Sequence, residues 1–325
     1  MIQFSIITPV FNREDCISRC INSVIRQQDC TGFGTEYSYE HIIVDDGSTD
    51  KTSLICEKYS SKYQEIKHIV LPKNRGTNAA RNIAIQSSVG NYIIILDSDD
   101  FFVENALYII ALTIKSHKDF SYFLFVPNDK IPFFNNNPYF KCCNEKVLSF
   151  SDFLSEKIST DYVHVCKSNI MKIFPFDESL RIYEGVFFLR FYKYAGKIFF
   201  KKEIITIRER SRQDSVTRFV FRINRDAIKR SINSTSLYIE WFENDYIEFN
   251  CHKVLATKLN SLFKNNVLLC NNIEANKYLN KLQEYNFKVN KKYLILYTLH
   301  LGWIQRLIIK FGLYIKYTIL NKKLK

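Results

Sequence analysis

The chain has 325 residues and nine cysteines, but it lacks any Cys-x-x-Cys pair from which a disulfide framework or a zinc site could be predicted. It also lacks internal repeats with periods of about 20–50 residues, which excludes solenoid and propeller folds. Its first apolar stretch ends at Pro9 and has no basic lead, so no secretory signal peptide is predicted. We therefore expect a cytoplasmic protein whose cysteines are free thiols.

Acidic residues are scarce toward the C-terminus. The formal net charge is +13, yet residues 1–100 carry 10 basic and 13 acidic side chains, whereas residues 101–325 carry 36 and 20. The 41 residues from Tyr285 onward contain nine Lys or Arg and no Asp or Glu. Such an excess favours an anionic partner. Because zinc-finger, RNP and GXXG signatures are absent, we expect no nucleic-acid partner, although a basic nucleic-acid-binding protein stays an alternative.

Short apolar runs alternate with segments of helical periodicity in the first hundred residues. Four strands are predicted, over residues 4–10, 41–44, 66–71 and 92–96, with helices between them. Continuously apolar strands are typical of a parallel sheet covered on both faces. After residue 100, helices are predicted over 101–115 and 182–194 and strands over 122–126, 162–166 and 198–207. An irregular segment is predicted over 128–144, and helices from about residue 220.

Polar residues follow each of these four strands. The segments are PVFN (9–12), DDGS (45–48), KNRG (73–76) and DSDD (97–100). In parallel sheets, ligands bind beyond the carboxyl ends of the strands, so we predict the functional site at this edge. The patterns GxGxxG and GxxxxGK[ST] are absent, which excludes the common dinucleotide-binding and P-loop sites.

Three of these segments offer specific chemistry. Asp97 and Asp99 suit Mg²⁺ or Mn²⁺ on a diphosphate, since such an ion keeps several waters and takes one or two protein carboxylates. A solvated turn or a helix N-cap is the alternative for this pair. Asp46 offers an acceptor to a base N–H or to ribose hydroxyls, or belongs to an ordinary turn. Residues 74–82 begin a helix whose N–H groups favour phosphate, which Arg81 can also bind.

Taken in order, four segments resemble the successive motifs of family 2 glycosyltransferases: FSIITPVFN (4–12), VDDGSTD (44–50), NRG with ARN (74–76 and 80–82) and LDSDD (96–100). The resemblance covers about residues 4–210 and implies the GT-A fold, a Rossmann-like α/β structure whose mostly parallel central sheet has helices on both faces. We expect this catalytic domain in residues 1–215 and a helical C-terminal region in residues 216–325. The resemblance further implies a nucleotide-sugar donor, usually UDP-linked, a divalent metal and inversion at the anomeric carbon.

The resemblance also assigns the nucleotide base to particular residues. By position, Pro9 and Phe11 line the base pocket, where Phe11 stacks on uracil. Asp46 accepts a hydrogen bond from the uracil N–H.

The remaining donor contacts follow in the same way. Asn74 and Arg81 lie near the nucleotide and its diphosphate. Asp97 contacts ribose or the metal, and Asp99 binds the metal, which is Mn²⁺ or Mg²⁺.

The catalytic base of the family usually lies in a Glu-Asp pair at the start of a helix. Here Glu184 is followed by Gly185, where the family has Asp. An inverting transfer needs a carboxylate to take the proton of the attacking hydroxyl, and we predict that Glu184 does so. The alternatives are that Glu184 only favours the helix dipole, that Asp177 or Glu178 is the base, or that the chain is a catalytically impaired, glycosyltransferase-like binding protein.

A basic segment, RERSRQDSVTR (208–218), resembles the family's segment that closes over the diphosphate. Arg208 and Arg212 are predicted to stabilise the charge that develops on the leaving UDP. A solvated surface loop is the alternative for this run of arginines.

The tail from residue 291 has apolar side chains on one side of a helical wheel and Arg306, Lys310 and Lys316 on the other. The apolar positions are Leu294, Tyr297, Leu301, Ile304, Leu307, Ile308, Phe311 and Ile315. Because the charges interrupt any apolar span of about 20 residues, we predict a helix lying on an anionic membrane surface. The protein would then be peripheral on the inner face of the cytoplasmic membrane; packing of the helix on the catalytic domain or on another subunit is the alternative.

The function that follows is a metal-dependent glycosyltransferase of the hexosyl or N-acetylhexosaminyl type. It would move one sugar from a UDP-sugar to a lipid-linked saccharide or a growing surface glycan, such as O-antigen, capsule or exopolysaccharide.

Overall fold

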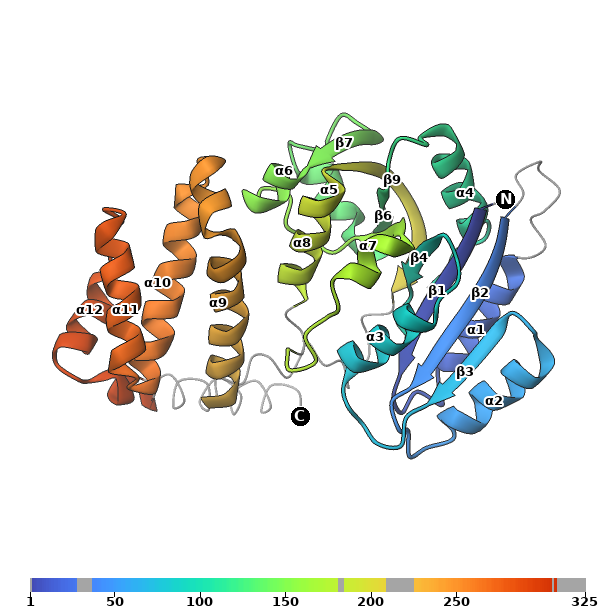
Figure 1. Cartoon of the computed structure of the whole chain (residues 1–325), viewed down its shortest axis with the longest axis horizontal. Coiled ribbons are helices and arrows are strands. Elements are labelled where there is room, and N and C mark those ends of the chain that lie inside the picture. Colours follow the sequence, from blue (N-terminus) through green and yellow to red (C-terminus); the bar gives the residue numbers. More distant parts are fainter. Residues whose placement is uncertain (1, 28–36, 181–183, 209–224, 306, 309–325) are drawn as a thin grey trace, which may run out of the picture. The chain divides into compact units, whose positions relative to one another are not determined.

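The computed structural model describes residues 2–27, 37–180, 184–208, 225–305 and 307–308. The chain separates into two compact units, Met1–Ser211 and Arg212–Lys325, whose elements are labelled in Figure 1. The boundary that we expect between residues 215 and 216 falls within 209–224, outside the described residues, and stays a prediction.

Across the residues that the structure describes, a nine-stranded sheet forms the centre of the first unit. Its order is β3-β2-β1-β4-β8-β6-β9-β5, and β7 pairs with β9. The strands are β1 (Ile2–Val10), β2 (Tyr37–Asp45), β3 (Ile66–Val70), β4 (Tyr92–Ile95), β5 (Asp100–Phe102), β6 (Tyr122–Pro127), β7 (Glu145–Ser149), β8 (Val163–Lys167) and β9 (Lys197–Arg208).

The first four strands are parallel, as their apolar runs predict. β1 lies between β2 and β4, and β3 pairs with β2. All four carboxyl ends therefore meet at one edge, and the segments 9–12, 45–48, 73–76 and 97–100 follow them there.

The other half of the sheet is mixed. β8 is antiparallel to both β4 and β6, and β9 is parallel to β6. Because β8 runs in reverse, its first residues lie at the same edge as the last residues of β6 and β9. This direction brings Asp161, just before β8, and Arg208, at the end of β9, to the edge predicted for the site.

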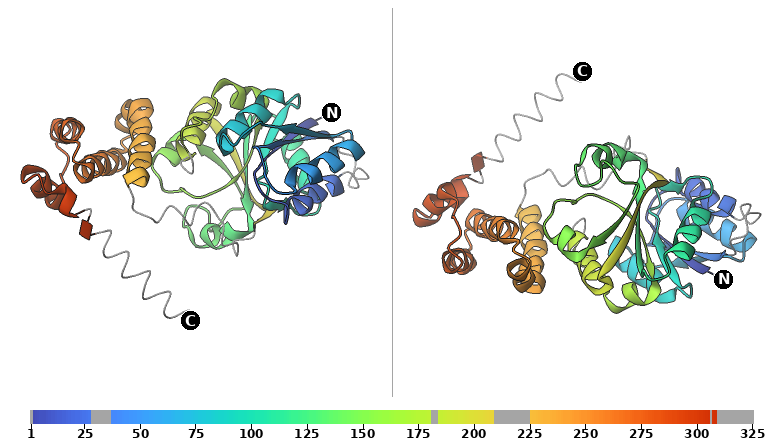
Figure 2. Two further views of the ribbon diagram at one scale, coloured as in Figure 1. Left: turned by 90° about the horizontal axis from the view of Figure 1, so that it is seen from below. Right: turned by 90° about the horizontal axis from the view of Figure 1, so that it is seen from above.

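Helices cover both faces of the sheet (Figure 2). A cluster of buried apolar side chains joins the sheet to α1 (Ile17–Ile25), α2 (Thr52–Lys62) and α4 (Ala106–Ser116). A second group consists of α3 (Thr77–Ser87), which packs on β1 and β2, with α7 (Ser168–Ile173) and α8 (Gly185–Ala195). The expected α/β architecture is confirmed.

Two local predictions are wrong. Residues 101 and 102 do not begin the helix expected over 101–115 but belong to β5 on β9, with Asp100 opposite Arg208, and α4 starts only at Ala106. The segment 128–144 is not wholly irregular, because it contains the 3₁₀ helix η2 (Asn128–Lys130) and α5 (Ile131–Asn136), and β7 and α6 (Phe150–Leu154) follow it. Tertiary packing of aromatic rings stabilises this region: Phe134 and Phe140 are fully buried, with ring centroids 5.2 and 4.7 Å from that of Phe200.

In its described residues, from 225 onward, the second unit folds into helices, as expected from about residue 220. They are α9 (Arg225–Glu248), α10 (His252–Leu269), α11 (Asn272–Glu284) and α12 (Lys291–Thr298). α10 packs against both α9 and α11 through a core that includes Leu255, Leu262 and Phe263. In the described ranges, no helix has the length and apolar composition needed to cross a bilayer.

The tail is not one continuous helix. α12 ends at Thr298, His300 has a positive φ of 54°, and the Leu301 N–H donates back to the Leu296 carbonyl at 2.8 Å. Half-buried Tyr297 packs its ring on Phe263 of α10, with centroids 5.7 Å apart. The first residues of the apolar face that we predicted to contact the membrane therefore pack against a helix of their own unit. Arg306 and residues 309–325 lie outside the described residues.

Candidate functional site

The loops after β1 and β2 are tied to each other. The Asn12 backbone N–H donates to Ser48 Oγ at 2.9 Å, and the Thr49 N–H donates to Asn12 Oδ1 at 2.8 Å. The Ser48 N–H in turn donates to Asp45 Oδ1 at 2.9 Å. These bonds fix the chain next to buried Pro9 and half-buried Phe11, the two residues predicted to line a base pocket.

Asp46 connects this pair of loops to the loop after β3. Its buried carboxylate accepts from the backbone N–H of Arg75 at 2.7 Å and from that of Gly76 at 2.8 Å. Exposed Asn74 precedes these two residues. Asp46 therefore determines the position of the loop at the start of α3.

Gly47 allows these loops to approach closely. Its φ is +73°, and a Cβ built on it would lie 2.9 Å from the Lys73 carbonyl carbon and 3.0 Å from the Asn74 nitrogen. Any side chain at Gly47 would both strain the backbone and displace the loop that Asp46 holds.

We expect Gly47→Ala to lower the free energy of unfolding by about 1–3 kcal/mol, measured by chemical denaturation. Gly76→Ala is the matched control, because Gly76 also has a positive φ, +99°, but a Cβ there meets no atom within 4 Å. Gly47→Ala should therefore cost more than Gly76→Ala. Equal losses would contradict a specific contact between Gly47 and the 73–74 backbone.

Two asparagines of α3 hold the segment that leads to α8. The Asn78 amide donates to the carbonyls of Asp177 and Leu180. Asn82 exchanges two hydrogen bonds with the Phe176 backbone, each 2.8 Å long. The start of α3 is thereby linked to the region of Glu184, about a hundred residues later in the chain.

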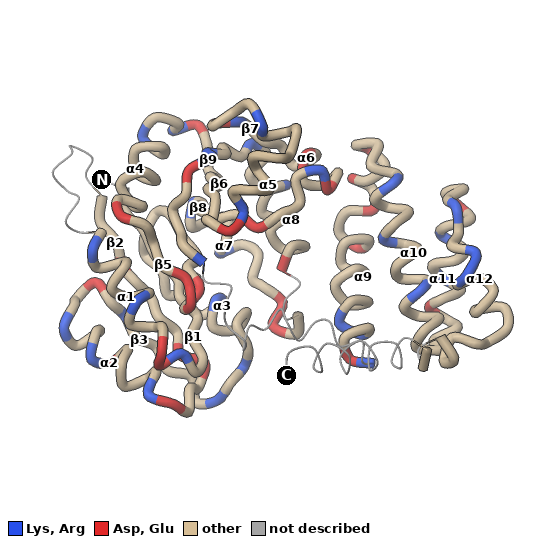
Figure 3. Tube along the Cα trace, turned by 180° about the vertical axis from the view of Figure 1, so that it is seen from behind, with Lys and Arg blue, Asp and Glu red and all other residues tan. Residues whose placement is uncertain are grey.

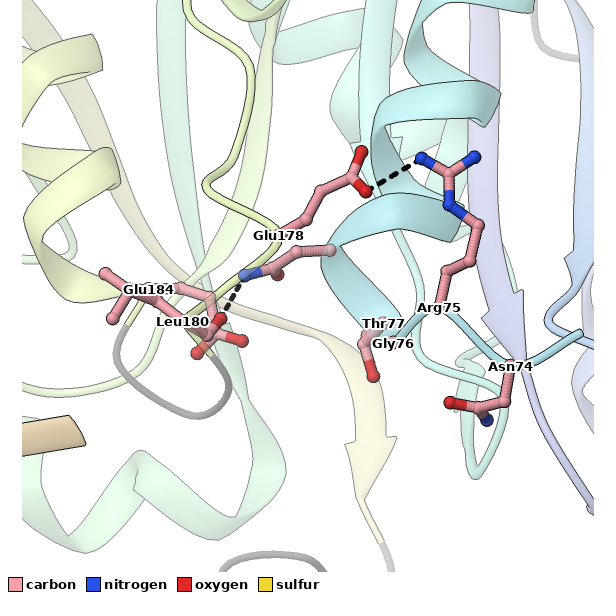
Figure 4. A pocket seen from close by; sticks show the side chains of 8 residues that line it. Asn74, Arg75, Gly76, Thr77, Glu178, Leu180 and Glu184 are labelled. Atoms are coloured by element: carbon pink, nitrogen blue, oxygen red, sulfur yellow. Dashed lines mark hydrogen bonds and ion pairs between the residues drawn. The ribbon is translucent and has the colours of Figure 1, made fainter. Parts of the chain in front are cut away.

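A pocket of about 220 Å³ lies between these two segments. Figure 4 shows Leu180 and Glu184 on one side and Arg75, Gly76 and Thr77 on the other. An exposed ion pair of 2.8 Å joins Arg75 to Glu178. Glu184, the predicted base, thus faces the same space as the predicted donor loop.

Arg81 connects two predicted site carboxylates. Its side chain is only 11 % exposed, with Nη2 3.0 Å from Asp97 Oδ1 and Nη1 3.3 Å from Glu184 Oε1. Burial alone would lower the pKa of Arg81, but the charges of Asp97 and Glu184 outweigh burial and raise that pKa. The guanidinium therefore stays charged and joins the end of β4 to the start of α8.

The carboxylates that follow β4 can hold a divalent metal only if water and diphosphate oxygens supply its other ligands. Among the described residues, no group of three His, Cys, Asp or Glu side chains could hold a metal by itself. Mg²⁺ and Mn²⁺ need only one or two carboxylates when water and diphosphate oxygens complete the shell. The Asp97 side chain is 43 % exposed, and Asp99 lies two residues further along, so this pair fits that requirement.

Arg208 belongs to a second charged cluster, on the other half of the edge. Its Nε lies 3.2 Å from Asp100 Oδ2 and its Nη1 lies 3.4 Å from Asp161 Oδ2. Lys130 Nζ also pairs with Asp161, at 3.2 Å, and the Arg208 N–H donates to Asn128 Oδ1 at 2.8 Å. Figure 3 shows acidic and basic segments together around β5. Arg212 lies outside the described residues.

His164 of β8 lies between the two clusters. Burial, then the charge of Arg208, lowers the pKa of His164 to about 3, and Arg81 acts in the same direction. Its ring stacks on Phe188, one turn after Glu184 on α8, with centroids 3.8 Å apart and planes 8° apart. His164 is therefore neutral near pH 7 and packs against the helix that begins at Glu184.

The structure brings together most of the residues predicted from the sequence. At one edge of the sheet, in the last residues of strands, in the segments just beyond them or at the start of the adjoining helices, lie Pro9, Phe11, Asp46, Asn74, Arg81, Asp97, Asp99, Glu184 and Arg208. Sequence reasoning missed Asn78, Arg75, Asp100, Asp161 and His164. Arg75, Asn78 and Asp100 lie within the predicted segments 73–76, 74–82 and 97–100. His164 had no signal beyond the predicted strand 162–166, and Asp161 precedes that strand.

Comparison with known proteins identifies the family. The sequence model of the family described as glycosyl transferase family 2 matches residues 5–174, more than half of the chain. The poly(ribitol-phosphate) beta-glucosyltransferase of Bacillus spizizenii is 39 % identical over 107 residues, which are 33 % of this chain and 16 % of that protein. The poly(ribitol-phosphate) beta-N-acetylglucosaminyltransferase TarS of Staphylococcus aureus is 32 % identical over 117 residues, 36 % of this chain and 20 % of TarS.

Solved structures agree in fold. S. aureus TarS 1–349 in complex with UDP-GlcNAc has a TM-score of 0.63 at 19 % identity, covering 96 % of this chain and 92 % of that one. The mannosyltransferase PcManGT from Pyrobaculum calidifontis, in complex with GDP-Man and Mn²⁺, has a TM-score of 0.54 at 12 % identity, covering 95 % and 86 %. The first curated relatives are matched over only 16 % and 38 % of their own lengths. From the family match and this fold, the chain belongs to glycosyltransferase family 2.

Proposed function

We propose that this chain moves one hexosyl or N-acetylhexosaminyl group from a UDP-sugar onto a hydroxyl group of a lipid-linked or growing surface polymer. The observation that carries the proposal is the pocket shared by Glu184 and the loop that begins α3. Complexes of structural neighbours with UDP-GlcNAc and GDP-Man support a nucleotide-sugar donor.

The donor base occupies the edge beyond β1 and β2. Phe11 stacks on uracil next to Pro9, and Asn74 lies near the nucleotide. Asp46 accepts from the uracil N–H in addition to its two backbone donors, because a carboxylate has about four acceptor positions.

Glu184 acts as the general base. As the acceptor oxygen bonds to the anomeric carbon, its proton passes to the Glu184 carboxylate and the bond from that carbon to the diphosphate breaks on the opposite face. This displacement inverts the anomeric centre. Arg81 holds Glu184 in position, and Arg208 with Arg212 stabilises the charge on the leaving UDP.

Asp97 and Asp99 hold a divalent metal, Mn²⁺ or Mg²⁺, when the donor is bound. The ion supplies positive charge next to the diphosphate oxygens. The Mn²⁺ in the complex of PcManGT supports this part of the proposal.

The acceptor is a cell-surface polymer. The poly(ribitol-phosphate) transferases among the relatives support a polymer of the teichoic acid type, alongside O-antigen, capsule and exopolysaccharide as members of the same class. We place the enzyme in the cytoplasm, peripheral on the inner face of the cytoplasmic membrane, where lipid-linked acceptors are assembled. The basic tail supports this location.

A donor screen tests the proposal. Purified full chain is incubated with a set of UDP-sugars, Mn²⁺ and lipid-linked acceptors, and UDP release and product mass are measured. We expect one UDP-sugar to be consumed, loss of turnover with EDTA, and at least about tenfold weaker Mn²⁺-dependent UDP binding in Asp99→Ala. No UDP release with any donor, together with unchanged UDP binding in Asp99→Ala, would overturn the enzyme assignment.

A second candidate is a binding protein that retains the donor site without turnover. It is favoured by one observation, the glycine at position 185 where the family has an aspartate. In that case, the same screen yields tight, Asp99-dependent UDP-sugar binding with no UDP release.

A further inference from the structure

The end of the described helical unit carries a row of exposed apolar side chains. Ile295 and Leu299, before the break at His300, are 56 and 58 % exposed, and Trp303, Leu307 and Ile308, after it, are 47, 54 and 59 % exposed. We call these five residues the outer row. They differ from the apolar side that the helical wheel predicts, since only Leu307 and Ile308 belong to both sets.

The other side of this segment is already covered. Tyr297 packs on Phe263 of α10. Gly302 is buried so tightly on α10 that a Cβ there would clash with the Val267 carbonyl oxygen. Packing within the unit therefore fixes this segment through one side, and the exposure of the outer row is a property of the folded bundle.

The segment that carries the outer row is basic, and Glu274 on neighbouring α11 is paired with Lys277 at 3.6 Å. Three exposed lysines lie within seven residues before Ile295, the first residue of the outer row: Lys288, Lys291 and Lys292. From Tyr285 to the last residue of the sequence there are nine basic and no acidic residues. Apolar side chains flanked by cations, with a tryptophan among them, match the boundary of an anionic bilayer, where Trp prefers the headgroup region and Lys pairs with lipid phosphate.

We infer that the outer row inserts into the headgroup boundary of an anionic lipid membrane, with the helical unit lying on the surface. The inference deepens the membrane attachment within the proposed function by assigning it to these five residues. The break at His300, with φ 54°, agrees with a segment lying in the plane, because a spanning helix needs about 20 uninterrupted residues. A second copy of the chain fits less well, since a symmetric contact would bring two sets of lysines together.

Vesicle flotation tests the inference without donor or acceptor, so its outcome does not depend on catalysis. The full chain is mixed with vesicles of phosphatidylcholine alone or with an equal part of phosphatidylglycerol. We expect flotation with the anionic vesicles only, and at least about a tenfold loss of the bound fraction in the double variant Leu299→Asp/Trp303→Asp. Leu54→Asp is the matched control, because Leu54 on α2 is 59 % exposed and belongs to the first unit; this variant should float like the parent chain.

A fluorescence measurement keeps the test valid if the double variant does not fold. The chain has two tryptophans, so Trp241→Phe leaves Trp303 as the reporter. Anionic vesicles should shift its emission to shorter wavelength, and lipids brominated near the headgroup should quench it. Equal flotation of parent and double variant, an unchanged Trp303 emission, or a dimer in sedimentation that the double variant abolishes would overturn the inference.

Discussion

Glu184→Gln is expected to lower kcat by about 10²- to 10⁴-fold while the donor KM stays within about threefold. Glutamine keeps the size of the side chain and can still accept a hydrogen bond from Arg81, 3.3 Å away, but it cannot take a proton from the acceptor hydroxyl. The loss should therefore appear in the chemical step. Steady-state kinetics with the donor identified in the screen measures both constants.

The control for this variant is Glu57→Gln, which neutralises an exposed carboxylate on α2. It should retain the parent kcat. Thermal unfolding of both variants shows whether the fold is intact. Full activity of Glu184→Gln would contradict the role of Glu184 as the base. The candidates for the base would then be Asp177 and Glu178, the other carboxylates before α8.

Arg81→Met should lower kcat/KM by about 100-fold and the free energy of unfolding by about 1–3 kcal/mol. The substitution keeps much of the side-chain volume but removes the cation between Asp97 and Glu184. Both carboxylates then lose a charged partner. The stability loss stays modest, because the Asp97 side chain is 43 % exposed and water screens it.

Arg75→Met is the matched control for stability. Its ion pair with Glu178 has both side chains more than 40 % exposed, so its removal should cost no more than about 1 kcal/mol. Arg81→Lys keeps the charge but cannot contact both carboxylates with a planar fork, and it should recover only part of the activity. Parent activity in Arg81→Met would contradict a functional link between the ends of β4 and α8.

The half of the site that we assign to the donor could be predicted from the sequence for a physical reason. Strands β1 to β4 each contain a short apolar run and are separated by single helices, a pattern typical of a parallel sheet. In such a sheet the carboxyl ends share one edge. Residues after each run, from Phe11 to Asp99, could therefore be grouped without knowledge of any contact.

The other half of the site could not be predicted, because the order of its strands depends on contacts between residues far apart in the sequence. The reversal of β8 between β4 and β6 has no local pattern, yet it places Asp161 and His164 at the site edge. β5 was mistaken for the start of a helix, since its three residues become a strand only by pairing with β9.

The tail shows the same limit. Helical periodicity cannot reveal a break at His300, and it cannot tell which apolar side a neighbouring helix covers. Gly302 on Val267 and Tyr297 on Phe263 decide that question, and they leave Leu299 and Trp303 exposed.

The sequence by itself determined the family, the parallel half of the sheet and the set of polar strand ends, because these depend on local apolar runs and on motifs contiguous in the chain. Only the tertiary structure decided that Arg81 joins Asp97 to Glu184, a residue 103 positions further along, and that Asp46 holds the loop before α3. Ion pairs and hydrogen bonds of this kind form between side chains that folding brings within about 3 Å, and no spacing along the chain encodes them.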